Sequence, residues 1–344
     1  DNTAIGYAAL SANTTAGNNT AVGLQALRYN TTGDKNVAVG KSALAANTTA
    51  DKNTGLGYFA GAAITTGARN TAVGSEAIRQ KTTSTDNTAV GFQALYQSSE
   101  GNHNTVVGAS AGYNISTGEY NVAVGSAALD ANTTASNNTA VGYNSLGANT
   151  TGTQNSAIGA YSLQSSTTAS YNSALGYDAL GDVTTGEANT AVGRQALRKN
   201  TTANDNSALG NSALEQNTTG AKNTAIGANA LDANTTANNN TAVGYASLTS
   251  NTTGAANDAY GMNALYSNTT GAENCAFGQS SLFSNTTASN NTAIGNQALT
   301  ENTTGIRNSA VGSLALGSNT IGQYNSALGY GALYANTTAS NNTA

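Results

Sequence analysis

Few residues in this 344-residue chain are of the types that carry out acid–base or nucleophilic chemistry. His103 is the one histidine and Cys275 the one cysteine. Catalysis needs a local group of acids, bases or metal ligands, and neither residue has such a group beside it in the sequence. We interpret His103 as a solvated turn residue and Cys275 as a small substitute for the Thr or Ser found at equivalent places. A lone cysteine also leaves no intrachain disulfide.

The acidic residues and one phosphate-loop-like stretch are no better candidates. Asp and Glu occur singly, for example Asp34, Glu100, Glu119 and Asp182. The glycine-rich nonapeptide that binds calcium in other repeat proteins does not occur. Gly40-Lys41-Ser42 has the ending of a phosphate-binding loop, but the residue five places before Gly40 is Lys35 where that motif needs glycine. The sequence therefore predicts no enzyme, no metal and no cofactor.

Composition narrows the range of partners. The net charge is -5, only 8% of residues are charged, and there is no basic run that could neutralise phosphates. No apolar stretch approaches the ~20 residues that span a bilayer. We therefore expect no nucleic-acid partner and no membrane insertion in this segment.

A strict repeat organises the whole chain. Asn recurs every seventeen residues from Asn2 to Asn342 with no insertion or deletion, which gives twenty full repeats of the form N-T-A-V-G-Y-x-A-L-x-x-N-T-T-(G/A)-x-x. We count positions one to seventeen from this Asn. Such a period is the mark of stacked repeats, and it predicts a single domain over residues 1–344. Because the chain starts and stops in the same phase of the repeat, we expect it to be a segment of a longer fibre.

The repeat predicts an all-β fold, a parallel β-solenoid of twenty 17-residue coils. Thr and Val favour strands, and a repeat this rich in Gly, Asn and Thr is a poor helix. Side chains alternate along a strand, so in N-T-A-V-G the Thr and Val share one face and the Ala takes the other. A second apolar pair, A-L, follows after two residues. We expect two or three short strands per coil, joined by Asn and Gly turns.

The apolar positions four and nine predict the core. We expect Val at four and Leu at nine to form the core ladder, and the Gly at five to form turns. The predicted ladder includes Val22, Leu27, Val39, Leu44, Val141, Leu146, Val243 and Leu248, and the turn glycines include Gly6, Gly23, Gly40, Gly142 and Gly244. Tyr260 and Phe277 replace Val at position four, so we expect the core to swell there.

Two repeats exchange residues in a way that tests this interior. Position nine is Gly61 and Gly112 instead of Leu, and in the same repeats position twelve becomes Ile64 and Ile115. The exchange predicts that positions nine and twelve point into the same small space. Val183 argues against a strict exchange, because Leu at position nine is kept in its repeat.

The strand Asn138-Thr139-Ala140-Val141-Gly142 and its variant Asn155-Ser156-Ala157-Ile158-Gly159 resemble an element of trimeric autotransporter adhesin heads. The longer form, with A-L and N-T-T-G, resembles repeat arrays of bacteriophage tail fibres. The resemblance implies a left-handed β-roll of three chains side by side, extracellular on a cell or virion surface. The repeats of that adhesin family are shorter than seventeen, so this chain departs from their pattern.

These features predict a structural shaft of adhesin or tail-fibre type, which supplies length, stiffness and display. Two large aliphatics per coil make a thin core, and the invariant period leaves no loop free to vary, so we expect the chain to pack with itself as a homotrimer or larger fibre. The alternative is that the array binds host-surface glycans through its position-six tyrosines, or ice through its Thr rows. N-x-T sequons also make candidate glycan acceptors of Asn13, Asn30, Asn47, Asn132 and Asn149.

Overall fold

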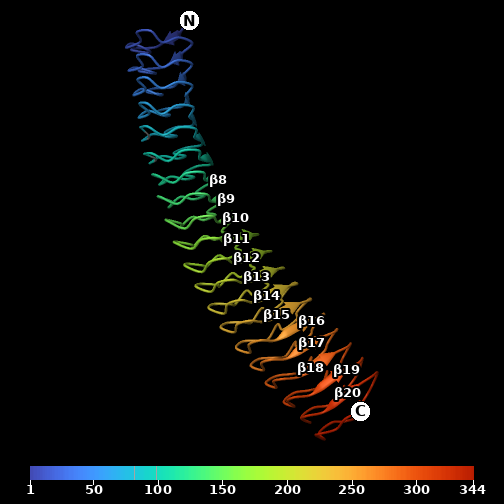
Figure 1. Ribbon diagram of the computed structural model, residues 1–344. Coiled ribbons are helices and arrows are strands. Elements are labelled where there is room, and N and C mark those ends of the chain that lie inside the picture. Colours follow the sequence, from blue (N-terminus) through green and yellow to red (C-terminus); the bar gives the residue numbers. More distant parts are fainter. Residues whose placement is uncertain (81, 98) are drawn as a thin grey trace. The chain divides into compact units, whose positions relative to one another are not determined.

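The computed structural model describes residues 1–80, 82–97 and 99–344, and the chain divides into two compact units, Asp1–Asn172 and Ser173–Ala344. Each unit contains ten short strands (Figure 1). The N-terminal unit contains β1 (Thr3–Ile5), β2 (Thr20–Val22), β3 (Val37–Val39), β4 (Thr54–Leu56), β5 (Thr71–Val73), β6 (Thr88–Val90), β7 (Thr105–Val107), β8 (Val122–Val124), β9 (Thr139–Val141) and β10 (Ser156–Ile158). The C-terminal unit contains β11 (Ser173–Leu175), β12 (Thr190–Val192), β13 (Ser207–Leu209), β14 (Thr224–Ile226), β15 (Thr241–Val243), β16 (Asp258–Tyr260), β17 (Cys275–Phe277), β18 (Thr292–Ile294), β19 (Ser309–Val311) and β20 (Ser326–Leu328).

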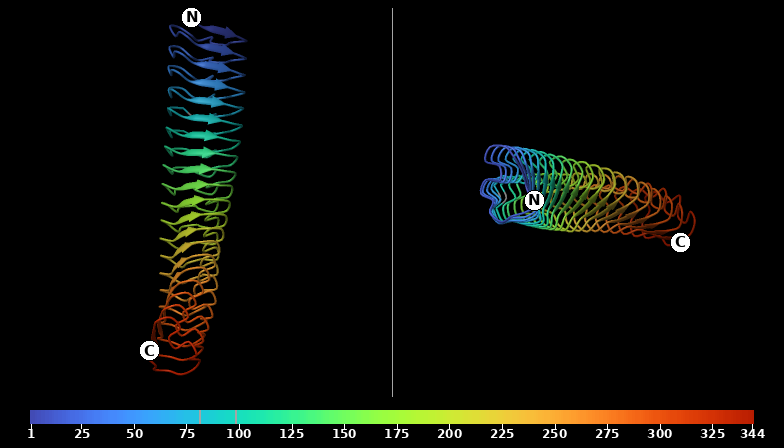
Figure 2. Two further views of the ribbon diagram at one scale, coloured as in Figure 1. Left: turned by 90° about the vertical axis from the view of Figure 1, so that its right-hand side faces the viewer. Right: turned by 90° about the horizontal axis from the view of Figure 1, so that it is seen from above.

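Within each unit the strands pair in parallel, with equivalent positions of successive repeats side by side. Ala21 of β2, for example, lies opposite Ala38 of β3. The left view of Figure 2 shows the strands within each unit stacked one above the next. Backbone hydrogen bonds between coils continue beyond the strands, as from Leu27 N to Ala43 O at 3.0 Å. The predicted parallel β-solenoid with a 17-residue coil is therefore confirmed.

Over the residues that the structure describes, each coil has one strand, so the prediction of two or three was wrong. The A-L pair lies in two consecutive turns, closed in the second coil by Ala26 N to Gly23 O at 3.3 Å and Asn30 N to Leu27 O at 3.2 Å. Gln25 and Leu27 have φ of 60° and 48°. Left-handed residues at positions seven and nine bend the chain sharply, and this bending prevents a second strand.

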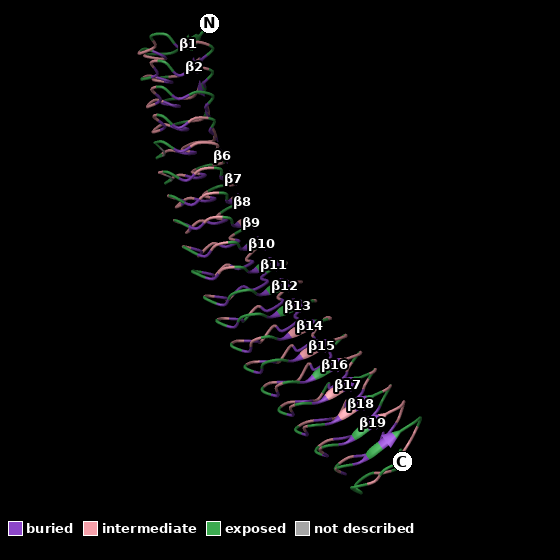
Figure 3. Cartoon of the chain, viewed as in Figure 1, coloured by how far each residue is buried: buried purple, intermediate pink, exposed green. Residues whose placement is uncertain are grey.

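The core is built from the opposite strand face to the one we expected. The position-three residue is buried in each of β2 to β20 and is Ala in all of them except β4 and β7, where it is Gly55 and Val106. In contrast, the position-four residues Val22, Val39, Val141 and Val243 are only half-buried. Leu27, Leu44, Leu146 and Leu248 are fully buried. The prediction that the position-four side chains form part of the core was therefore wrong. The interior already holds the Leu at nine and the Asn at one and twelve, so the residue opposite them is small. The larger Val106 is fully buried in the coil where Gly112 takes the place of the Leu. Buried and exposed residues consequently alternate along each coil (Figure 3).

The large aromatic residues at position four also face outward. Phe277 is 52% exposed and Tyr260 is half-buried, and their rings stack at 4.7 Å between centroids. Because both side chains lie outside the coil, the core does not swell at these repeats, contrary to our expectation. The stack covers part of the outer surface of β16 and β17.

The position-five glycines end each strand with a backbone that other residues rarely adopt. Their φ values include 127° at Gly6, 129° at Gly23, 134° at Gly40, 137° at Gly142 and 136° at Gly244. A Cβ on Gly142 would lie 2.5 Å from the carbonyl oxygen of Gly159 in the next coil. Both the φ and the close stacking of backbones require glycine here.

The exchange between positions nine and twelve is confirmed. Ile64 and Ile115 are buried, and a Cβ on Gly61 would lie 3.1 Å from Ile64 Cδ1 and 2.7 Å from Leu44 Cδ2. The isoleucine therefore fills the space that the leucine leaves. Leu180 and Val183 are both fully buried in one coil, so the interior also accepts the two together.

This exchange predicts strong coupling between two substitutions. Ile64→Asn should leave a cavity and destabilise its coil by roughly 2 to 3 kcal/mol, and Gly61→Leu alone should overpack the interior. The double variant restores the consensus and should recover most of the loss, with a coupling energy of about 1 to 3 kcal/mol. Urea denaturation of the four proteins measures it, and additive effects would contradict the shared space.

Candidate assembly interface

The outward residues of the strands, at positions two and four, form a surface that we call the outer strand face. Thr, Ser or Val fills position two in most strands, and an aliphatic fills position four. Eleven of the position-four side chains are exposed, with exposed fractions from 36% to 75%: Ile5, Leu56, Val90, Val107 and Ile158 in the N-terminal unit, and Leu175, Leu209, Ile226, Phe277, Ile294 and Leu328 in the C-terminal unit. Each unit therefore carries a column of apolar side chains along its strands.

The outer strand face is almost uncharged. Of the outward residues in the twenty strands, only Asp258 carries a charge. Cys275, the neighbour of Asp258 in β17, is half-buried, and burial raises the pKa of its thiol, with a further contribution from the Asp258 carboxylate. A thiol held in its neutral form is a poor nucleophile, which agrees with its interpretation as a small strand residue.

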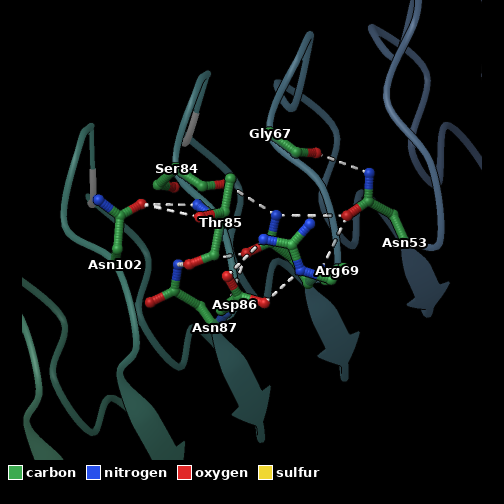
Figure 4. Close-up of polar contacts among 9 residues, drawn as sticks. Asn53, Gly67, Arg69, Ser84, Thr85, Asp86, Asn87 and Asn102 are labelled. Atoms are coloured by element: carbon green, nitrogen blue, oxygen red, sulfur yellow. Dashed lines mark hydrogen bonds and ion pairs between the residues drawn. The ribbon is translucent and has the colours of Figure 1, made fainter.

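The position-one asparagines form a buried ladder that closes every coil. Asn53 Nδ2 donates to the carbonyl of Gly67 in its own coil at 2.8 Å, and Asn53 Oδ1 accepts from the backbone N–H of Asn70 in the next coil at 2.8 Å (Figure 4). The same pair of bonds recurs along both units, as at Asn206. These amides satisfy backbone groups that would otherwise be buried without partners.

The position-twelve asparagines form a second buried ladder. Asn47 Nδ2 donates to Asn30 Oδ1 at 2.7 Å and to Ala50 O at 3.0 Å. Asn30, Asn47, Asn132 and Asn149 are fully buried, and Asn13 is half-buried with its Nδ2 bonded to Ala16 O. A glycan is attached through Nδ2, and the folded coil does not present this atom at the four buried residues. Glycan attachment at these sequons stays a prediction. Lys81 and Ser98 replace Asn at this position and lie outside the described residues.

The Thr and Tyr rows of the alternative function have different exposures. The position-thirteen hydroxyls are used internally, as in Thr31 Oγ1 to Thr48 O at 3.0 Å, so this row does not present free donors. The position-six tyrosines are exposed, but none of them lies in an adjacent coil to another, so they form separate sites rather than a stripe. They are Tyr7, Tyr58, Tyr143, Tyr177, Tyr245 and Tyr330.

Position seventeen is an exposed corner where side chains contact along the stack. Arg69 and Asp86 form a two-pronged ion pair, with Nε to Oδ1 at 2.6 Å and Nη2 to Oδ2 at 2.7 Å (Figure 4). The Arg69 hydrogen bonds are the main reason that the pKa of Asp86 is lowered. His103 has φ of 57° and stacks on Tyr120 at 4.9 Å. This placement agrees with a turn residue, since His tolerates the left-handed region better than most.

The remaining chemistry-bearing residues form no cluster. Across residues 1–80, 82–97 and 99–344, no three His, Cys, Asp or Glu side chains gather where they could hold a metal ion. The same residues contain no helix that is long and apolar enough to cross a membrane. Sequence reasoning missed the outer strand face. The alternation of T-A-V does place Thr and Val on one face of the strand. The sequence does not show whether that face is buried or exposed.

Comparison with known proteins adds no assignment: no protein-family model matches the sequence, and no curated protein matches it either.

Proposed function

We propose that this chain is a shaft segment of an extracellular fibre, of adhesin or tail-fibre type, in which copies of the chain pack side by side through the outer strand face. The observation that carries the proposal is the column of exposed, uncharged, mostly apolar side chains along the strands of each unit. Contiguous exposed apolar surface of this kind marks an interaction site. A second copy has the same spacing between coils and meets the column coil by coil.

Repetition makes such packing favourable. Fully burying an exposed aliphatic side chain contributes about 1.5 to 3 kcal/mol, and covering the exposed half contributes about 1. Association costs roughly 4 to 15 kcal/mol once per chain. The burial free energy of one coil is smaller than the cost of association. Burial is repeated in every coil, whereas the cost of association occurs once per chain. A long in-register array therefore suits a role in which contact area grows with length.

We propose three chains around a common axis, displayed on a cell or virion surface. The support is the resemblance of the N-T-A-V-G strand to trimeric adhesin heads, together with the outer strand face that a threefold arrangement would cover. Scanning transmission electron microscopy of the purified fibre measures the mass per unit length. Three chains per coil rise is the expected result, and one chain per coil rise would overturn the assembly.

Charges on the outer strand face should dissociate the fibre without unfolding the coil. The triple variant Leu175→Glu, Leu209→Glu and Phe277→Glu places three carboxylates in non-adjacent strands whose position-four side chains are about half exposed. We expect analytical ultracentrifugation to give the mass of a single chain and circular dichroism to stay unchanged, because these side chains are outside the core.

The matched control puts the same charges elsewhere on the same coils. Thr185, Thr219 and Thr287 are exposed at position fourteen, and their replacement by Glu should leave the assembly intact. If the strand variant keeps the parent mass, or if the control dissociates equally, the outer strand face is not the interface.

A further inference from the structure

One hollow in the C-terminal unit lies where the side chains of the array depart from their usual pattern. It has a volume of about 500 Å³ and lies over the turns that follow β14 to β17, which Figure 1 labels. Small-molecule sites usually occupy ~300 to 1,000 Å³. The hollow is formed by residues at positions six, seven and ten, so it lies outside the outer strand face.

The residues at position ten form two opposite sides of the hollow, one aromatic and one acidic. They are Asp232, Thr249, Tyr266 and Phe283 in four successive coils. The rings of Tyr266 and Phe283 are stacked with 5.1 Å between centroids and 8° between planes. Tyr266 therefore turns its other face toward the preceding coil, where Thr249 is small. Successive coils are about 4.8 Å apart, so the space over Thr249 is one flat ring thick, with Tyr266 on one side and Asp232 on the other.

The polar groups of the hollow are unused by the fold. Asp232 Oδ1 is buried and has no hydrogen-bond partner in the structure. Burial, helped by Glu215 and opposed by Lys199, raises the pKa of Asp232 to about 6, so the carboxylate is mostly ionised at pH 7. Asn229 and Asn263 line the hollow at position seven, and neither side-chain amide has a hydrogen bond to the described residues. An unpartnered buried acceptor is costly unless a ligand supplies the donor.

We propose that this hollow binds one neutral pyranose ring of a saccharide. The C–H face of the sugar stacks on Tyr266, a hydroxyl donates to Asp232 Oδ1, and the amides of Asn229 and Asn263 bond further hydroxyls. The exposed ring of Tyr245 borders the open side. A flat aromatic wall lies opposite a free acceptor, and each of the two coils also contributes an amide, Asn263 beside Tyr266 and Asn229 beside Asp232. This arrangement fits a ring that is apolar on one face and rich in hydroxyls at its edge.

Saturation-transfer NMR tests this with the full chain and three probes: the methyl glycosides of glucose, galactose and mannose. We expect saturation transfer from at least one of them, and about a tenfold loss of affinity in both Tyr266→Ala and Asp232→Ala. Tyr334→Ala is the matched control, since Tyr334 is an exposed position-ten tyrosine away from the hollow. It should bind like the parent. Absence of transfer from all three sugars, or full binding by Tyr266→Ala, would overturn the proposal.

Asp232→Asn separates a sugar site from a cation site. The amide keeps an oxygen acceptor and removes the charge, so sugar binding should fall by only a few fold. Tetramethylammonium is the comparison probe: if it binds, loses binding in Asp232→Asn and no sugar binds, the hollow is a cation site and the saccharide proposal is wrong. The inference does not rest on the shaft, because Tyr266→Ala should leave the mass per unit length of the fibre unchanged.

Discussion

Gly142→Ala should destabilise the coils around β9 by at least about 4 kcal/mol. Two costs combine at this position. A φ of 137° lies in a region that is essentially restricted to glycine, at about 1 to 3 kcal/mol of strain. The new Cβ would also lie 2.5 Å from Gly159 O and 2.6 Å from Gly159 C. Those atoms belong to backbone that is itself stacked, so a whole coil must move to make room.

Two glycine controls separate these costs. Gly329 has the same repeat position and a φ of 131°, but nothing lies within 4 Å of its Cβ direction, so Gly329→Ala should show the strain alone. Gly17 also faces open space, and Gly17→Ala should be nearly neutral. Native-state hydrogen exchange measures the local free energy of opening, coil by coil. Equal protection in Gly142→Ala and Gly17→Ala would contradict the stacking argument.

Asn206→Ala should lower the free energy of unfolding by about 2 to 4 kcal/mol, the second large effect. Asn206 is fully buried in the position-one ladder of the C-terminal unit. Its Nδ2 donates to Gly220 O at 2.9 Å, and its Oδ1 accepts from the Asn223 backbone N–H at 2.9 Å. Alanine leaves the Asn223 N–H unpaired inside the coil, at about 1 to 3 kcal/mol, and it adds a cavity. Gly220 O loses one of its two side-chain donors and keeps the other, Asn217 Nδ2 at 2.9 Å.

Asn211→Ala is the control of the same chemical type, because Asn211 is exposed at position six and its amide contacts only Ser212. We expect a change within about 0.5 kcal/mol. Asn206→Asp keeps the acceptor for Asn223 but directs a buried carboxylate at Gly220 O, and it should be at least as harmful as alanine. Thermal and urea unfolding compare the three. A loss no larger for Asn206→Ala than for Asn211→Ala would show that the ladder does not hold the coil closed.

The sequence by itself determined the architecture. The invariant spacing of Asn and Gly fixes a coil of seventeen residues, and the strand preferences of Thr and Val place the strand directly after the Asn. The paired change of Gly61 and Ile64 predicted that positions nine and twelve share one space, and the structure confirms it. These inferences succeed because they depend on the period and on local residue preferences, and the same pattern recurs in every repeat.

Only the tertiary structure decided which strand face is inside. Alternation places Thr and Val together, but it assigns neither face to the core. The buried Leu27 and the two Asn ladders leave space for the Ala methyl, so Val22 turns outward and creates the outer strand face. The left-handed backbone at Leu27 was equally hidden, because leucine does not favour φ near 48° and holds it only where packing compensates. The hollow beside Tyr266 depends on four coils at once. Packing between coils settles such features, and a single repeat does not encode them.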